Sequence, residues 1–108
     1  MPDPAIVKCY VTIWEFHVRA RHEIQFQNIY GPNGEWGQLF AKAEGFIRTE
    51  LNRDVNDPLR YVTLDYWRSK EAYQSFRQQF QAEYLKIDHR CERLTDKEEQ
   101  VGEFQIVD

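Results

Sequence analysis

Residues 60–76 have the sequence RYVTLDYWRSKEAYQSF, and a change of pattern inside this stretch decides the fold. Residues 59–67 alternate between two faces, with the period of two that is typical of a β-strand. After Ser69, large rings recur at Tyr73 and Phe76, at the spacing of one helix face. The stretch therefore predicts a strand that passes directly into a helix.

The residues before this stretch predict the partner strand of a hairpin. Residues 45–54 alternate in the same way, and Asn56, Asp57 and Pro58 between the two strands are typical turn residues. We therefore expect residues 45–54 and 59–67 to pair as an antiparallel β-hairpin.

The residues after it predict a long helical segment and a last strand. The apolar helix face continues to Leu94, so an unbroken helix would measure roughly 35 Å. Because strands of this size are shorter, we expect a break near residues 79–81. Thr95 and Glu98 predict a capping box for one more helical turn. Residues 101–107 alternate as a closing strand.

The first part of the chain predicts one strand and two helical pieces. Residues 6–18 alternate with apolar or aromatic side chains on both faces, so both faces must be covered. Residues 21–30 have helical spacing and end at a Gly-Pro pair. A second helical piece follows the capping residue Asn33 and ends at Gly45.

These elements follow one another in the order βαββαβ. In this order a four-stranded antiparallel sheet carries its helices on one face, which is the ferredoxin-like α+β arrangement. A length of 108 residues fits one core, so we expect a single domain over residues 1–108.

The composition argues against several classes of protein. A net charge of −4 disfavours nucleic acid and membrane surfaces as partners. No stretch approaches the ~20 apolar residues of a transmembrane helix, and the N-terminus lacks the pattern of a signal peptide. We therefore expect a cytoplasmic protein with no nucleic-acid or membrane partner, and favour buried thiols at Cys9 and Cys91 over a disulfide.

The aromatic residues suggest a second subunit. They make up 15% of a chain that is only 42% hydrophobic. Several rings lie on strand faces apart from the main aliphatic set, namely Trp14, Phe16, Phe46, Tyr61 and Trp67. Because one monomer would expose them as a large apolar patch, we expect a homodimer packed sheet face to sheet face. The pattern leaves open whether Thr63 and Trp67 face the helices or the partner.

Several short motifs carry a family resemblance that extends from Val7 to Val107. The most diagnostic passage is the strand followed by Trp67, Ser69, Ala72 and Tyr73. The other residues are Tyr30-Gly31-Pro32, Gly34, Trp36, Leu39, Phe40, Gly45-Phe46, Thr49, Leu51, Arg53-Asp54, Arg60-Tyr61, Thr63, Asp65, Cys91-Glu92 and Leu94-Thr95. With these residues the chain resembles the antibiotic biosynthesis monooxygenase (ABM) family. The resemblance implies a dimeric α+β barrel.

The resemblance also implies a substrate pocket. Some members of the family oxidise quinols or polyketide anthrones with O₂ and without metal or flavin, and a Trp and a Tyr six positions later line their pocket. Trp67 and Tyr73 match that spacing. The strand Asn of those enzymes is Thr63 here, and Arg90 is the nearest counterpart of their helix Arg. The candidate pocket residues are therefore Thr63, Trp67, Tyr73, Phe76 and Phe80, and none is singled out as catalytic.

The chemistry of such an oxygenase explains why these residue types would be needed. The substrate must become a carbanion that passes an electron to O₂, away from water. Aromatic walls exclude water, and a donor such as the Thr63 hydroxyl stabilises the developing phenolate. The alternative interpretation is that Tyr73, Phe76 and Phe80 are ordinary core residues on a helix face.

Heme is the alternative ligand, since other members of the family bind and degrade it. Those members use a strand Asn, a helix Trp and a helix His. Here the first strand has no Asn, Phe76 or Phe80 stands near the position of the Trp, and His89 lies beyond the ligand position. We therefore expect no cofactor.

The remaining polar residues suggest structural roles. His17, His22 and His89 lack the spacing of a metal site, so we expect no metal. For Glu15, His17, Arg48, Glu50 and Asp65, a structural ion-pair network is favoured over a buried polar cluster.

Two functions stay open from the sequence. The first is an ABM-like protein that binds a planar hydrophobic small molecule and oxidises it as a cofactor-independent monooxygenase, acting on a quinol or polyketide-type aromatic. The second is a non-catalytic ligand-binding or heme-binding module of the same fold.

Overall fold

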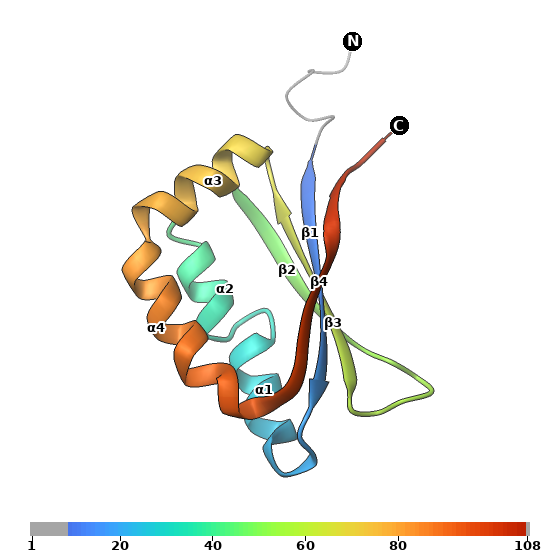
Figure 1. The fold of residues 1–108 in the computed structure, drawn as a ribbon. Coiled ribbons are helices and arrows are strands. Elements are labelled where there is room, and N and C mark those ends of the chain that lie inside the picture. Colours follow the sequence, from blue (N-terminus) through green and yellow to red (C-terminus); the bar gives the residue numbers. More distant parts are fainter. Residues whose placement is uncertain (1–8, 108) are drawn as a thin grey trace.

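A computed structural model describes residues 9–107, which form a four-stranded antiparallel sheet with its helices on one face (Figure 1). The strands lie in the order β2-β3-β1-β4. They are β1 (Tyr10–Val18), β2 (Phe46–Arg53), β3 (Arg60–Trp67) and β4 (Thr95–Gln105). The helices are α1 (Glu23–Tyr30), α2 (Glu35–Phe40), α3 (Lys70–Gln79) and α4 (Gln81–Cys91), with short 3₁₀ turns η2 (Ala20–His22) and η3 (Glu92–Leu94). The predicted ferredoxin-like α+β fold is confirmed.

The strand and helix predicted from residues 60–76 are β3 and α3. Ser69 caps α3, because its Oγ accepts a hydrogen bond from the Ala72 backbone N at 3.0 Å. The predicted break near residues 79–81 is also confirmed. Phe80, between α3 and α4, has ψ +27° and interrupts the helical path.

The last strand differs from the prediction. It begins at Thr95 rather than at residue 101, so the predicted capping box at Thr95 and Glu98 is wrong. β4 pairs with β1 in an antiparallel ladder. Thr95 lies opposite Val18 at one end, and Gln105 lies opposite Tyr10 at the other. A full ladder of backbone hydrogen bonds outweighs one local cap. Residues 6–8 of the predicted first strand lie outside the described residues.

The aromatic strand residues face the helices rather than a second subunit. Phe16, Tyr61 and Trp67 are buried in the core beneath the helix layer, and Trp14 and Phe46 pack against that core. The expectation that a lone monomer would expose these rings is therefore wrong. The aromatic set faces inward, and the aliphatic set of the same strands faces outward. Thr63 shares the inward face with Trp67.

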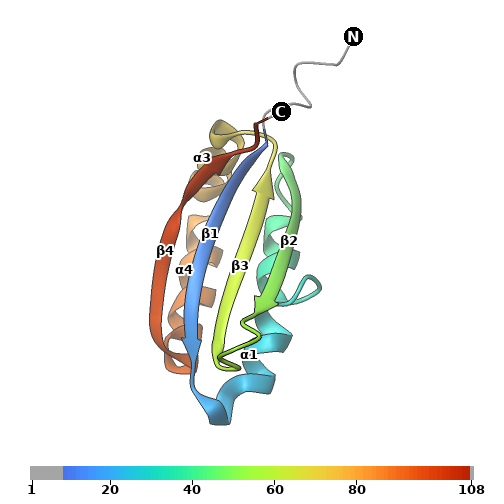
Figure 2. The ribbon, with the colours of Figure 1, turned by 90° about the vertical axis from the view of Figure 1, so that its right-hand side faces the viewer.

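The opposite face of the sheet carries no helix in the described chain (Figure 2). Its apolar part includes Val62, Leu64 and Tyr66 of β3, which are half-buried, and Phe104 of β4, which is exposed. Arg48 stacks on the Tyr66 ring, with its Cζ 4.0 Å from the ring centre. This outward face is called the open sheet face below.

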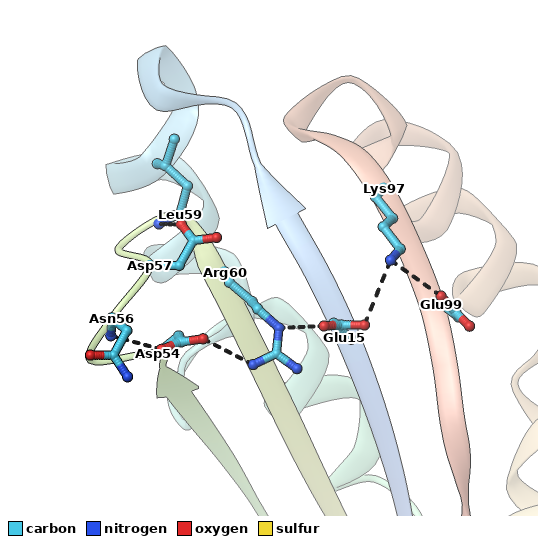
Figure 3. A network of polar contacts seen from close by, with 8 residues as sticks. All are labelled: Glu15, Asp54, Asn56, Asp57, Leu59, Arg60, Lys97 and Glu99. Carbon is cyan, nitrogen blue, oxygen red and sulfur yellow. Dashed lines mark hydrogen bonds and ion pairs between the residues drawn. The ribbon is translucent and has the colours of Figure 1, made fainter.

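A row of ion pairs crosses one end of the open sheet face (Figure 3). Arg60 donates to Glu15 and, at 3.0 Å, to Asp54. Lys97 lies 3.9 Å from Glu15 and 3.5 Å from Glu99. The predicted structural network is thus confirmed for Glu15.

Other polar residues and the cysteines lie elsewhere. Arg48 and Glu50 form a separate ion pair at 3.2 Å. Cys91 is buried and Cys9 is half-buried, and both are free thiols. Among residues 9–107, no helix has the length and hydropathy needed to cross a bilayer.

Gly45 allows the start of β2 to approach α3. A Cβ atom at Gly45 would lie 2.3 Å from the Cβ of Ala72. We therefore expect Gly45→Ala to lower the free energy of unfolding by about 1–3 kcal/mol in urea denaturation. Adding Ala72→Gly removes the clash and is expected to restore part of that loss. Additive losses in the double variant would contradict this contact.

Candidate functional site

A pocket lies between the inward face of the sheet and the helices. The empty space in it, together with the open solvent at its mouth, amounts to about 430 Å³. The sheet contributes Trp14, Phe16, Thr49, Thr63, Asp65 and Glu98, and the helices contribute Tyr30, Trp36, Phe40, Tyr84 and Asp88. The pocket thus combines aromatic rings with three carboxyl groups.

Rings from three helices form a continuous wall on the helix side. Trp36 of α2 contacts Tyr84 of α4 edge to face, with ring centres 4.9 Å apart. The Trp36 ring centre is also 6.1 Å from that of Tyr30 and 5.8 Å from that of Phe40. Such a wall excludes water and presents ring faces and edges to a flat ligand.

Asp65 is the buried carboxylate of the pocket. It lies in the middle of β3, where Thr12 of β1 and Thr49 of β2 are its cross-strand neighbours. The Thr49 hydroxyl donates to Asp65 Oδ1 at 2.5 Å. Burial raises the pKa of Asp65 to about 6, and the hydroxyls of Thr49 and Thr12 offset part of that rise. A carboxylate with this pKa is ionised at neutral pH yet accepts a proton readily.

The raised pKa of Asp65 also affects stability. Because the folded state holds the proton more tightly than the unfolded state, the free energy of unfolding falls as pH rises from about 3.8 to about 6. We expect Asp65→Asn to unfold with a free energy about 1–3 kcal/mol higher at neutral pH, and to flatten this pH dependence. Denaturant titrations across pH 4–7 measure both effects. Glu44→Gln, which removes an exposed carboxylate, should leave the slope unchanged.

The structure distributes the five candidate pocket residues over two environments. Thr63 lines the pocket. Trp67 and Phe76 are 0% and 1% exposed, and both lie in the core behind Phe40, with ring centres 5.5 and 5.4 Å from it. Tyr73 and Phe80 are half-buried and pack against that core without lining the pocket.

Trp67 has an unpartnered polar atom. Its Nε1 is buried and has no hydrogen-bond partner among the described residues. A buried N–H without an acceptor is unfavourable by about 1–3 kcal/mol. The core around Trp67 is therefore apolar except for one free donor.

The nearest counterparts of the family's helix Arg and heme-ligating His lie outside the pocket. Arg90 is exposed and holds Glu35 through two hydrogen bonds, one of them 3.2 Å long. His89 is exposed and lies 3.7 Å from Glu92. Among the pocket residues, all within the described range 9–107, none is His, Cys or Met. The same part of the chain contains no group of three or more potential metal-ligating side chains.

Asp65 is the functional candidate that the sequence interpretation placed in the wrong group. It was expected to join the ion pairs of Arg48 and Glu50, but β3 turns it toward the helices. The signal was present in the alternation: Asp65 shares its face with Tyr61, Thr63 and Trp67. A single carboxylate on a strand face that otherwise carries buried aromatic rings is a candidate for a functional site.

Comparison with known proteins agrees with this fold. SnoaB, a cofactor-independent oxygenase from Streptomyces nogalater whose structure was solved as a mutant, is 22% identical, with a TM-score of 0.68 over 89% of this chain and 90% of that one. A candidate antibiotic biosynthesis monooxygenase from Bordetella bronchiseptica is 19% identical, with a TM-score of 0.70 over 92% and 97%. A dimeric ferredoxin-like protein from an uncultured marine organism is 15% identical, with a TM-score of 0.67 over 96% and 92%.

A family profile identifies the chain more directly than these distant structures. No protein of curated function shows a significant sequence match. The profile described as antibiotic biosynthesis monooxygenase matches residues 10–86, from the start of β1 into α4. This span includes β1–β3, all of α1–α3, and most residues of the pocket. The chain therefore belongs to the antibiotic biosynthesis monooxygenase family.

Proposed function

We propose that the pocket binds a planar hydrophobic aromatic molecule, of quinol or polyketide type, and that the protein oxidises it with O₂ without a cofactor. The observation that carries this proposal is the position of Asp65, a buried carboxylate with a raised pKa on the wall of an aromatic pocket. SnoaB, which shares the fold, is described as a cofactor-independent oxygenase. We infer the same use of O₂ here.

Two residues of the pocket assist the first step of this reaction. Asp65 removes a proton from the activated CH₂ of an anthrone-type substrate, and the Thr63 hydroxyl donates to the oxygen that gains negative charge. The carbanion passes one electron to O₂, and the two radicals combine to a peroxide. Return of the proton and loss of water convert CH₂ to C=O. One O₂ is consumed, and one H₂O is formed for each carbonyl.

The other candidate residues support the pocket in this proposal. Thr63 contacts the ligand, whereas Trp67 and Phe76 hold Phe40 in place from behind. Tyr73 contacts Trp67 with ring centres 5.3 Å apart, and Phe80 contacts Phe76 at 5.7 Å.

Oxygen consumption with a panel of anthrones and quinols tests the proposal. With an anthrone we expect uptake of one O₂ per carbonyl formed, in protein freed of metal by chelation. Absence of uptake across the panel would contradict an oxygenase. Titration with hemin tests the alternative: a Soret shift at stoichiometric hemin would support heme binding, which the absence of His, Cys and Met from the described pocket lining disfavours.

We further propose that two copies of the chain pair through the open sheet face, as an α+β barrel in the cytoplasm. In this pairing the apolar part of that face, with Leu64 and Tyr66 of β3 and with Phe104 across β1 from them, packs against the same patch of a second copy. One structural relative is described as a dimeric ferredoxin-like protein.

Substitution of Leu64 tests the dimer. We expect a mass of twice 13.1 kDa by light scattering at micromolar concentration, and a single-chain mass for Leu64→Arg, because an arginine would be buried without a partner. Leu85→Arg is the matched control, since Leu85 is exposed on α4. A dimeric Leu64→Arg would place the interface elsewhere.

A further inference from the structure

The charges of the pocket are all of one sign. Asp65, Asp88 and Glu98 line it, and none of its lining residues in the described chain is Lys, Arg or His. Asp65 is buried, Asp88 is half-buried and Glu98 is exposed, so the carboxyl groups lead from the interior to the mouth. A net negative field in a partly desolvated pocket favours a positively charged ligand.

Among the described residues, basic side chains lower the pKa of only one of the three carboxyl groups, that of Asp88. Loss of hydration raises the pKa of all three carboxyl groups, and repulsion from Glu92 adds to the rise for Asp88 and Glu98. Arg77 and His89 oppose part of the rise for Asp88. No cationic side chain offsets the rise for Asp65 or for Glu98.

Two arginines lie beside the pocket without lining it, and each already has a partner in the protein. Arg77 stacks on the Tyr84 ring, with its Cζ 3.8 Å from the ring centre, and donates to the Tyr73 hydroxyl at 3.1 Å. Arg90 is paired with Glu35. The pocket therefore offers negative charge that no basic side chain in its lining neutralises.

The aromatic lining suits a cation as well as a flat ring. Trp14, Tyr30, Trp36 and Tyr84 are among the lining residues, and such ring faces attract cations, by about 0.5–2 kcal/mol for each well-placed contact. Aromatic rings beside carboxylates form the usual surroundings of a bound ammonium group. An anionic ligand would meet repulsion from every ionised group that lines the pocket.

We propose that the ligand of this pocket is a flat aromatic ring that carries an aliphatic amine, whose ammonium group lies between Asp88 and Glu98 while the ring extends inward toward Asp65. This inference rests on the proposed function, because it assumes that the pocket takes a planar aromatic molecule. An ammonium group beside Asp65 would lower the pKa of that carboxyl group and weaken it as a base. An ammonium group near the mouth of the pocket leaves Asp65 able to accept the substrate proton.

Three probes with the same ring and different charges test the proposal. They are naphthylmethylamine, naphthylmethanol and naphthoate, titrated at neutral pH and low salt against the full chain by calorimetry. We expect the amine to bind about tenfold more tightly than the alcohol, and naphthoate to bind most weakly. Added salt should reduce the preference, because the mouth of the pocket is exposed.

A double variant assigns the preference to the carboxyl groups. Asp88→Asn with Glu98→Gln is expected to bring the amine to within about twofold of the alcohol, with the affinity for the alcohol unchanged. Glu44→Gln with Glu83→Gln removes two exposed charges outside the pocket and should keep the preference. Circular dichroism verifies that each variant is folded. Should the first variant fail to fold, the three probes on the native chain decide alone.

The outcomes separate this inference from the proposed function. Equal affinities for the three probes, or tighter binding of naphthoate, would contradict the preference for a positively charged ligand. They would not contradict the proposal that the pocket binds planar aromatic molecules. A preference that survives the loss of Asp88 and Glu98 also overturns it. If none of the probes binds, both the pocket as a ligand site and its charge preference fail.

Discussion

Replacement of Asp65 by asparagine is expected to lower the rate of oxygen uptake by roughly 10²–10⁴-fold, the usual contribution of a general base. Asparagine keeps the size of the side chain and can still hydrogen-bond to Thr49 and Thr12, but it cannot accept the substrate proton. The pocket itself should therefore persist, and binding of a product analogue should change little. Steady-state oxygen uptake and analogue titration measure the two quantities.

The pH profile distinguishes a base from a structural residue. With Asp65 present, turnover should rise with pH through about 6, as the carboxylate ionises. With Asp65→Asn, the remaining rate should instead grow steadily with hydroxide concentration. Glu44→Gln is the control for loss of one carboxylate. A variant that lost activity together with stability, or that kept the inflection near pH 6, would remove Asp65 from this role.

Truncation of Trp67 to alanine is expected to lower the free energy of unfolding by about 3–5 kcal/mol. Its indole is fully buried and contacts Phe40, Phe46, Tyr73 and Phe76, with ring centres between 5.0 and 5.5 Å apart. Loss of this ring leaves a cavity that the surrounding rings fill only in part. Urea denaturation by fluorescence of the remaining tryptophans measures the change, and Val55→Ala, at an exposed turn, should have almost no effect.

The variant Trp67→Phe separates the core role from a role in the reaction. Phenylalanine retains most of the buried ring but removes the unpartnered Nε1–H. If Trp67 only supports the pocket wall, turnover should remain close to that of the native chain. A large fall in turnover with little change in stability would show that the indole N–H serves the substrate instead.

Local patterns in the sequence were sufficient for most of the fold. The alternation of β3 and the helical spacing after Ser69 each depend on neighbours within a few residues, and the break around Phe80 follows from the length of the helical stretch compared with that of the strands. The start of β4 could not be predicted in this way. Thr95 has a good local cap pattern, but its partner is Val18, far away in the chain.

The candidate site was predicted less completely. Thr63 could be located because the family motif marks its position on the strand. Trp36, Tyr84 and Asp88 of the pocket come from helices whose periodicity identifies only an apolar face. Which rings of that face border an empty space depends on how α2 and α4 pack, and no spacing in the sequence contains that information.

The sequence by itself determined the order of elements, the hairpin and the family, because each is encoded in contiguous residues. The tertiary structure decided which face of each strand is inside. Both faces of β1 and β3 are largely apolar. Alternation alone therefore could not show whether the aromatic face or the aliphatic face of these strands lies in the core. Packing decided it: large rings fill the deep space beneath the helices, and this places Asp65 in the pocket instead of on the open sheet face.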